Sequence, residues 1–143
     1  MKIIRSTAGI QALVRSARRT GKSIGFVPTM GALHEGHLSL IRAARRENSL
    51  VVVSIFVNPI QFDRARDLRA YPRTLARDAR LAAKAGADVV FAPSARAMYP
   101  PDFQTFVEVT RLSLPLEGRF RPGHFRGVAT VVAKLLSIVG PCR

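Results

Sequence analysis

The sequence predicts an α/β fold in which a parallel sheet is flanked by helices. The nearly unbroken β-branched run at residues 50–57 is typical of a central strand that is buried on both faces. Shorter apolar runs at 24–27 and 88–93 alternate with stretches of helical periodicity. Because the first strand, the helix after it and the next strand form a βαβ unit, we expect these strands to be parallel.

The same reasoning assigns the remaining elements in order. We expect helices at about residues 7–20, 37–47, 74–85 and 123–139. We expect strands at 24–27, 50–57, 88–93 and 105–109, the last alternating as a half-exposed strand does. Pro28 should end the first strand, since proline cannot donate to a sheet ladder. The polar, arginine-rich segment 63–73 should form a loop over the strand ends.

Length and composition predict one globular domain. The chain has 143 residues, of which 48% are hydrophobic and 22% are charged. No apolar run approaches the roughly 20 residues that span a bilayer, and the first residues lack the apolar core of a signal peptide. The single cysteine, Cys142, cannot form an internal disulfide. We therefore expect a cytoplasmic location and no membrane partner.

The formal net charge of +14 has two interpretations. It could mark a surface that binds a nucleotide, a nucleic acid or an anionic lipid. It could instead reflect solvated arginines on helix faces, which the scatter of these residues over the predicted helices favours. Because no aromatic residues interleave with them, we expect no specific nucleic-acid partner.

Residues 28–37 carry the strongest chemical signal. Gly31 and Gly36 bracket a loop between a strand and a helix, and His34 and His37 stand three positions apart. A helix N-terminus attracts anions, glycines let the backbone approach a phosphate, and imidazoles can donate hydrogen bonds to its oxygens. This order predicts a nucleotide-phosphate site. The alternative is a structural turn with two exposed imidazoles.

Two further positions suit a ligand. Asn58 and Gln61 follow the central strand, and open α/β sheets bind ligands beyond the carboxyl ends of their strands. Amides fit a small polar substrate because each offers a donor and an acceptor. The alternative is an Asn-Pro turn with ordinary loop amides. His124 begins the last helix, where it could face an anion or be only a helix cap.

Three longer motifs occur in order along the chain. They are Val-Pro-Thr-Met-Gly-Ala-Leu-His-Glu-Gly-His at 27–37, Ser-Ile-Phe-Val-Asn-Pro-Ile-Gln-Phe at 54–62 and Arg-Pro-Gly-His-Phe-Arg-Gly at 121–127. Together they resemble the pantothenate synthetase (pantoate–β-alanine ligase) family. The His-x-Gly-His spacing resembles the signature of the nucleotidyltransferase superfamily related to class I aminoacyl-tRNA synthetases. The resemblance implies a Rossmann-like fold.

The resemblance also implies a reaction in two steps, within coenzyme A biosynthesis. The carboxylate of pantoate attacks the α-phosphorus of ATP, which gives pantoyl adenylate and pyrophosphate. The amine of β-alanine then displaces AMP and forms pantothenate. Mg²⁺ would accompany ATP as a substrate-bound ion, and no residue of the chain is expected to bind a metal directly.

Site residues follow from the matched motifs. The resemblance implies catalytic roles for His34 and His37, the latter as proton donor. It implies ATP binding by Pro28, Thr29, Met30, Gly31, Ala32, Leu33, His34, Glu35, Gly36 and His37. It implies pantoate and β-alanine binding by Met30, Asn58, Gln61, Tyr71, Arg121 and His124. A homodimer is also implied, with 105–109 in the contact region.

The resemblance covers nearly all 143 residues but only the first half of a family member. We therefore expect residues 1–143 to be an incomplete N-terminal nucleotide-binding domain, without the C-terminal domain. Two motifs of the family do not occur here. They are Gly-Glu-Lys-Asp, which supplies an ATP-binding lysine and aspartate, and Ser-Ser-Arg, which plays the part of the synthetases' mobile lysine loop. An alternative function is thus a catalytically incompetent fragment that keeps the fold and at most weak nucleotide binding. A sheet edge is expected to lie uncovered after the last helix.

Overall fold

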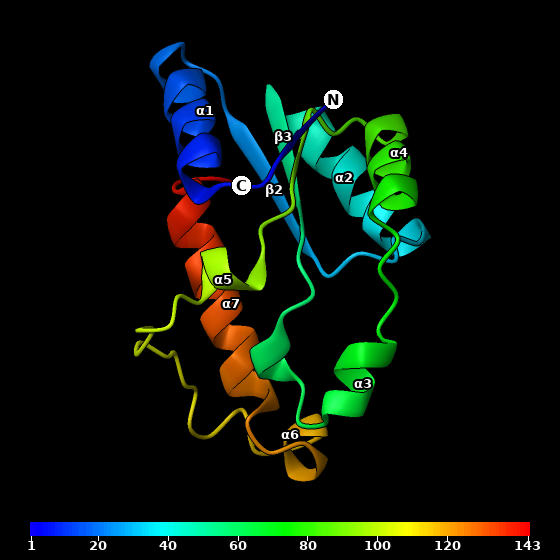
Figure 1. The fold of residues 1–143 in the computed structure, drawn as a ribbon. Helices are drawn as coiled ribbons and strands as arrows, with labels where there is room; N and C mark the ends of the chain where they lie inside the picture. The colour runs from blue at the N-terminus through cyan, green and yellow to red at the C-terminus, as the bar shows by residue number, and fades with distance from the viewer.

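A four-stranded parallel sheet forms the centre of the computed structural model, which describes residues 1–143 (Figure 1). Its strand order is β1-β4-β3-β2, and every neighbouring pair is parallel. The strands are β1 (Lys2–Ile4), β2 (Ile24–Thr29), β3 (Leu50–Ile55) and β4 (Val89–Phe91). The predicted α/β class is confirmed. Strand β1 was not predicted, because three residues carry no periodic signal and their pairing with β4 joins distant parts of the chain.

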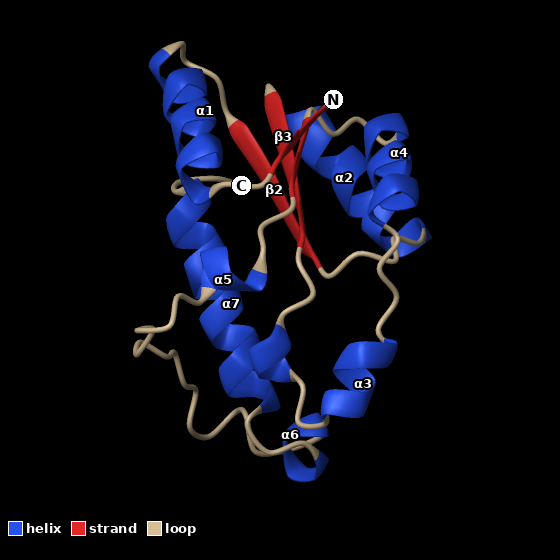
Figure 2. Ribbon diagram, viewed as in Figure 1, coloured by secondary structure: helices blue, strands red, loops and turns tan.

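Four long helices cover the two faces of this sheet (Figure 2). They are α1 (Thr7–Arg19), α2 (Glu35–Glu47), α4 (Leu75–Lys84) and α7 (His124–Val139). Four short helices lie among the loops: η1 (Pro59–Gln61), α3 (Ala65–Ala70), α5 (Ala95–Met98) and α6 (Glu117–Phe120). None of the helices is long and apolar enough to span a bilayer.

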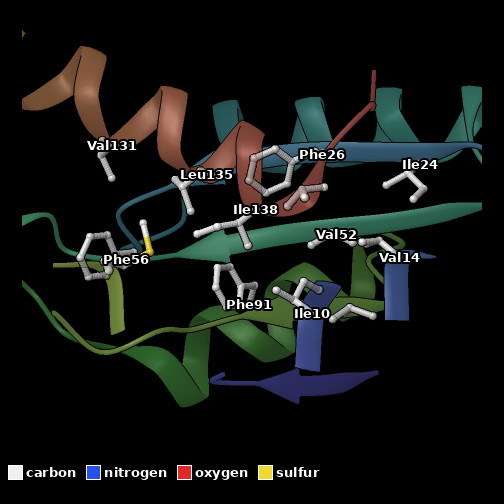
Figure 3. Close-up of a cluster of buried hydrophobic side chains, with 13 residues drawn as sticks. Ile10, Val14, Ile24, Phe26, Val52, Phe56, Phe91, Val131, Leu135 and Ile138 are labelled. Carbon is white, nitrogen blue, oxygen red and sulfur yellow. The ribbon is translucent and has the colours of Figure 1, made fainter. Parts of the chain in front are cut away.

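Alternating side chains divide the core into two layers. On β3, Val52 packs in the layer that α1 and α7 cover, while Val51 and Val53 pack in the layer that α2 and α4 cover. Figure 3 shows the first layer, which includes Ile10 of α1 and Leu135 of α7. Burying a valine, isoleucine or leucine side chain contributes about 1.5–3 kcal/mol, so both layers stabilise the sheet.

Strand β2 continues through Pro28, contrary to the prediction that Pro28 ends it. The strand lies at the edge of the sheet and pairs only with β3. The backbone N–H of Phe26 points to the open side, where it donates to the carbonyl of Arg143 at 2.7 Å. Pro28 follows two residues later and faces the same side, so its missing N–H costs no ladder hydrogen bond. On this open side Arg143 also donates to the carbonyl of Ile24, at 2.9 Å.

The strand predicted at 105–109 is wrong. These residues have no regular structure, because no strand lies beside them as a partner. Instead, the N–H of Val107 donates to the hydroxyl of Thr130 on α7 at 3.0 Å. Phe106, Val107 and Val109 remain 40–45% exposed.

The predicted loop at 63–73 contains helix α3. The Arg73 guanidinium caps the C-terminal end of α3, because it donates to the carbonyls of Leu68, Arg69 and Tyr71. Helix α2 begins two residues earlier than predicted, since His34 caps its first turn. Both differences shape the region beyond the carboxyl ends of β2 and β3.

Candidate functional site

The loop after β2 makes a sharp left-handed turn. Thr29 starts it, because its hydroxyl donates to the carbonyl of Ser54 at 2.7 Å and accepts from the N–H of Gly31 at 3.1 Å. Gly31 has a φ of 88°, and the following Ala32 has a φ of 51°. A left-handed conformation costs a non-glycine residue about 1–2 kcal/mol, so Ala32 must be held by its surroundings.

Asp78 on α4 holds this turn. Its carboxylate accepts hydrogen bonds from the N–H groups of Ala32 and Leu33, each at 2.9 Å, and from the Thr74 hydroxyl at 2.9 Å. Asp78 is completely buried. A buried carboxylate is tolerated only when its oxygens are hydrogen-bonded, and here every partner belongs to the loop or to the start of α4.

Sequence reasoning missed Asp78, although a signal existed. Position 78 lies three residues after Leu75 and four before Ala82, on the apolar stripe of the helix. A carboxylate on such a stripe must find buried donors.

Because Asp78 holds the turn, fewer backbone N–H groups of the loop are available for the predicted phosphate site. The backbone N–H groups of Ala32 and Leu33 already donate hydrogen bonds to Asp78. The Leu33 side chain is buried in the second core layer. The predicted contacts of these two residues with ATP stay a prediction, and they would need atoms other than those N–H groups.

His34 and His37 cap helix α2 together. His34 Nδ1 accepts from the N–H of Gly36 at 3.2 Å, and His37 Nδ1 accepts from the N–H of His34 at 3.4 Å. A Cβ at position 36 would lie 3.0 Å from the His34 ring, so glycine suits this close approach. Since each Nδ1 is an acceptor, each neutral ring carries its proton on Nε2. The pair therefore keeps two N–H donors for a ligand.

The charge state of His37 favours this arrangement. Its pKa is lowered from 6.5, first by burial and then by the neighbouring His34, while the Asp78 carboxylate acts in the opposite direction. The two rings lie 4.1 Å apart between centroids. His37 is thus expected to be neutral at pH 7. Glu35 lies outside the pair and forms an exposed ion pair with Arg42.

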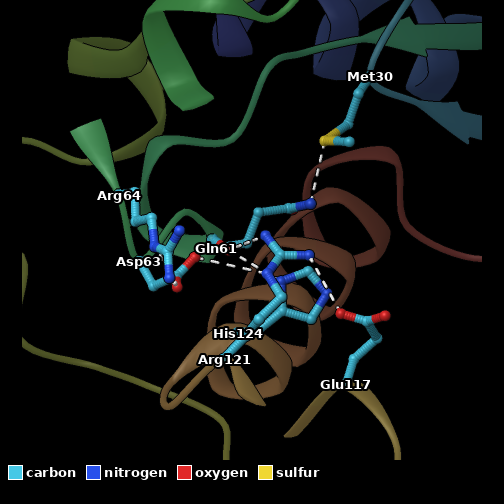
Figure 4. A network of polar contacts seen from close by, with 7 residues as sticks. All are labelled: Met30, Gln61, Asp63, Arg64, Glu117, Arg121 and His124. Atoms are coloured by element: carbon cyan, nitrogen blue, oxygen red, sulfur yellow. Dashed lines mark hydrogen bonds and ion pairs between the residues drawn. The ribbon is translucent and has the colours of Figure 1, made fainter. Parts of the chain in front are cut away.

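A second polar cluster follows β3. The Asn58 amide is completely buried and donates from Nδ2 to Gln61 Oε1 at 2.9 Å and to the carbonyl of Gly127 at 3.1 Å. Its Oδ1 accepts from the Tyr99 hydroxyl at 2.7 Å. Gln61 Nε2 donates towards Met30 Sδ at 3.0 Å (Figure 4). Asn58 therefore has internal partners at both ends, whereas Gln61 presents its NH₂ group.

Arg121 and His124 contact Gln61 from its backbone side (Figure 4). His124 Nδ1 lies 2.8 Å from the Gln61 carbonyl, and a carbonyl only accepts, so Nδ1 carries the proton. Arg121 lies 3.5 Å from the same oxygen and forms ion pairs with Asp63 at 3.4 Å and Glu117 at 3.8 Å.

A cavity of about 280 Å³ lies where these segments meet. Part of its lining consists of predicted site residues, namely Pro28, Thr29, Met30, His37, Asn58, Gln61 and Tyr71. Its apolar side is lined by Phe56 and by Val128, Val131, Val132 and Leu135 of α7. His34, Arg121 and His124 do not line it. An apolar cavity with few polar groups is typical of a site for a small ligand.

A neighbouring cavity of about 390 Å³ shares Met30 and Phe56 with the first. Its charged members, Arg73 and Asp78, are already engaged in the internal hydrogen bonds described above. The 280 Å³ cavity is therefore the better candidate for a ligand.

No group of three histidine, cysteine, aspartate or glutamate side chains is placed to hold a metal ion.

A parallel α/β sheet with a His-x-Gly-His pair at the start of α2 is consistent with the class of protein that the sequence resemblance implied, the nucleotidyltransferase superfamily. Comparison with known proteins narrows this class. The family model for pantoate-beta-alanine ligase matches residues 2–143. The chain belongs to the pantoate–β-alanine ligase family, as the sequence resemblance predicted.

Curated relatives and solved structures agree with this placement. The chain is 59% identical to the pantothenate synthetase of Geobacter sulfurreducens over 99% of its own length and 50% of that protein. It is 59% identical to that of Thermotoga neapolitana over 100% of its own length and 51% of that protein. The chain thus spans about half the length of these relatives.

Two crystal structures show the same fold. The Thermus thermophilus enzyme matches with a TM-score of 0.91 and 49% identity, over 99% of this chain and 50% of that one. The Francisella tularensis ligase, solved in complex with beta-gamma ATP and β-alanine, matches with a TM-score of 0.92 and 44% identity, over 99% and 54%.

Replacing Asp78 by asparagine tests the anchoring of the loop. An amide has one acceptor atom, so one of the two backbone N–H groups of Ala32 and Leu33 would face an NH₂ group instead. We expect a loss of about 2–4 kcal/mol in the free energy of unfolding, measured by urea denaturation. Asp67→Asn, an exposed change on α3, should alter this free energy by less than about 0.5 kcal/mol. Equal effects of the two variants would contradict the anchoring role.

The histidine pair predicts a pH dependence with a defined sign. Because the pKa of His37 in the folded state lies below 6.5, the folded state disfavours the protonated ring. The contribution of His37 to stability is therefore present above pH 6.5 and is lost as the pH falls through the folded pKa. Imidazole NMR should give a titration midpoint below 6.5 and a proton on Nε2 above it. His37→Gln should remove this part of the pH dependence, and a midpoint above 6.5 would refute the assignment.

Proposed function

We propose that this chain provides the ATP-binding and pantoate-binding part of a pantothenate synthetase. The reaction would be the ATP-dependent condensation of (R)-pantoate with β-alanine through pantoyl adenylate. One observation carries the proposal: His37 at the start of α2 and Gln61 after β3 line the same cavity. A phosphate-binding group and a substrate-binding group thus face a common space, as in-line transfer between two substrates requires.

The ATP phosphates would lie against the histidine pair. Both Nε2–H groups are free to donate to phosphate oxygens, since both Nδ1 atoms are used within the cap. Donors aimed at developing negative charge stabilise a transition state without reorganisation. The matched ligase from Francisella tularensis was solved with an ATP compound and β-alanine, which supports this choice of substrates. Mg²⁺ would enter as a substrate-bound ion on the phosphates.

Pantoate would occupy the cavity between Gln61 and α7. Its carboxylate and hydroxyl oxygens suit the NH₂ donor of Gln61, and its two methyl groups suit the wall formed by Val131 and Leu135. Tyr71 lines the same cavity and packs its ring edge-on against Phe62 at 5.7 Å. Direct contacts of Asn58, Arg121 and His124 with pantoate stay predictions, as does the role of His37 as proton donor.

The proposal includes a homodimer. Exposed apolar side chains gather on the segment before α7, where Leu112 and Leu116 are 82% and 81% exposed. Exposed apolar side chains in one segment are typical of protein contacts, and here they would meet as loops because no strand forms at 105–109. The cytoplasmic location and the assignment of residues 1–143 as an N-terminal domain also stay predictions.

Calorimetric titration tests the nucleotide site directly. ATP with Mg²⁺ should bind the chain, and the His34→Ala, His37→Ala double variant should bind at least about tenfold more weakly because two donors to phosphate are lost. The control variant Arg15→Ala, Ser16→Ala removes a positive charge from the exposed side of α1 and should bind like the wild type.

The outcome also separates the two functional hypotheses. Binding that depends on the histidines, followed by pantoate binding, supports the synthetase site. The alternative of an incompetent fragment predicts at most weak nucleotide binding. Equal binding by the wild type and the double variant would contradict the histidine site.

A further inference from the structure

A line of polar side chains runs from Tyr99, next to α5, to the cavity. The Tyr99 hydroxyl contacts Asn58 Oδ1 at 2.7 Å, Asn58 Nδ2 contacts Gln61 Oε1 at 2.9 Å, and Gln61 Nε2 reaches Met30 at 3.0 Å. Tyr99 does not line the cavity. Its hydroxyl can therefore act on a ligand only through Asn58 and Gln61.

One backbone carbonyl fixes the direction of every hydrogen bond in this line. The carbonyl of Gly127 can only accept, and it lies 3.1 Å from the Asn58 amide, so the NH₂ end of Asn58 must face it. Asn58 Oδ1 then faces Tyr99, which must donate. Asn58 Nδ2 faces Gln61, which must present its oxygen and turn its own NH₂ group towards the cavity.

The fixed position of that carbonyl follows from a close helix contact. Helix α7 approaches η1 so closely at Gly127 that a Cβ there would lie 2.4 Å from the carbonyl oxygen of Ile60 and 2.6 Å from the Cα of Gln61. Only glycine allows this approach, which brings the Gly127 carbonyl to Asn58. The Gly127 carbonyl, which orients the Asn58 amide, thus belongs to the backbone and cannot rotate.

Tyr99 is suited to be a permanent donor. Burial raises its pKa to about 12, so the hydroxyl keeps its proton at any physiological pH. Its ring is held independently of the hydroxyl, by Phe56 at 6.1 Å and Phe103 at 5.0 Å between ring centroids. Removing only the hydroxyl therefore leaves the packing of the ring in place.

We propose that Tyr99 is a positioning residue that, through Asn58, makes Gln61 present its NH₂ group and not its carbonyl oxygen to the cavity. The cavity then selects a ligand with an oxygen acceptor, such as a carboxylate or a hydroxyl, over one with an N–H donor at the same place. The identity of that ligand as pantoate rests on the proposed function. The orientation of Gln61 itself does not.

Without the Tyr99 hydroxyl, the Gly127 carbonyl alone orients the Asn58 amide. In Tyr99→Phe the completely buried Asn58 Oδ1 loses its donor, and an unsatisfied buried acceptor is unfavourable. Asn58 can relieve this only by moving, which loosens its hydrogen bond to Gln61 Oε1 and lets Gln61 present either end.

The test compares the wild type, Tyr99→Phe and the matched control Phe103→Leu. The control perturbs the packing of the Tyr99 ring but keeps its hydroxyl. The first measurement needs no ligand: the nuclear Overhauser effect between the Gln61 NH₂ protons and the Met30 methyl group. It should be present in the wild type and the control and be clearly weakened in Tyr99→Phe. Thermal unfolding confirms that all three chains are folded.

The second measurement is the Kd of pantoate and of its primary amide, pantoamide, by NMR titration. Tyr99→Phe should raise the Kd of pantoate about 5- to 30-fold, the effect of one hydrogen bond. It should also reduce the preference for pantoate over pantoamide, which a purely structural defect would leave unchanged. The control should keep this preference.

Each result decides a separate question. An unchanged Overhauser effect in Tyr99→Phe, or an unchanged preference with intact pantoate binding, would overturn the positioning role. A wild-type chain that does not bind pantoate would overturn the proposed substrate. The Overhauser effect alone would then decide whether Tyr99 positions Gln61.

Discussion

The hydrogen bonds from the loop to Asp78 determine the shape of the candidate site. The buried carboxylate accepts two backbone N–H groups from a turn whose alanine is left-handed, and no other group of the chain replaces it there. This turn sets where His34 caps α2, and the cap in turn sets the position of the His37 ring. It also places Met30 at the cavity. A mechanism that depends on exact donor positions therefore depends first on a residue whose carboxylate is used within the protein.

The candidate site offers hydrogen-bond donors to a ligand because the acceptor atoms of its side chains are used within the protein. The Nδ1 atoms of both histidines and the Oε1 atom of Gln61 are used within the protein, so the remaining Nε2–H and NH₂ groups face outward. No arginine or lysine lines the 280 Å³ cavity. Selectivity for anionic oxygen would thus come from oriented neutral donors, while the net charge of +14 lies elsewhere on the molecule.

The sequence predicted what depends on local patterns. The central strand, the four long helices and the loop with the histidine pair all have such patterns, and the structure contains them. It did not reveal contacts between distant residues, such as Asp78 with Leu33, which are 45 positions apart, or Tyr99 with Asn58, which are 41 apart. The strand predicted at 105–109 failed for the same reason, because alternation cannot show whether a partner strand exists.

The most direct test of this account is a crystal structure of the chain with a non-hydrolysable ATP analogue and pantoate. The account predicts phosphate oxygens within hydrogen-bonding distance of the Nε2 atoms of His34 and His37. It also predicts a pantoate oxygen on the NH₂ group of Gln61, with Asn58 still bonded to Tyr99. Phosphates bound away from the histidines, or a Gln61 amide with its oxygen towards the ligand, would contradict it.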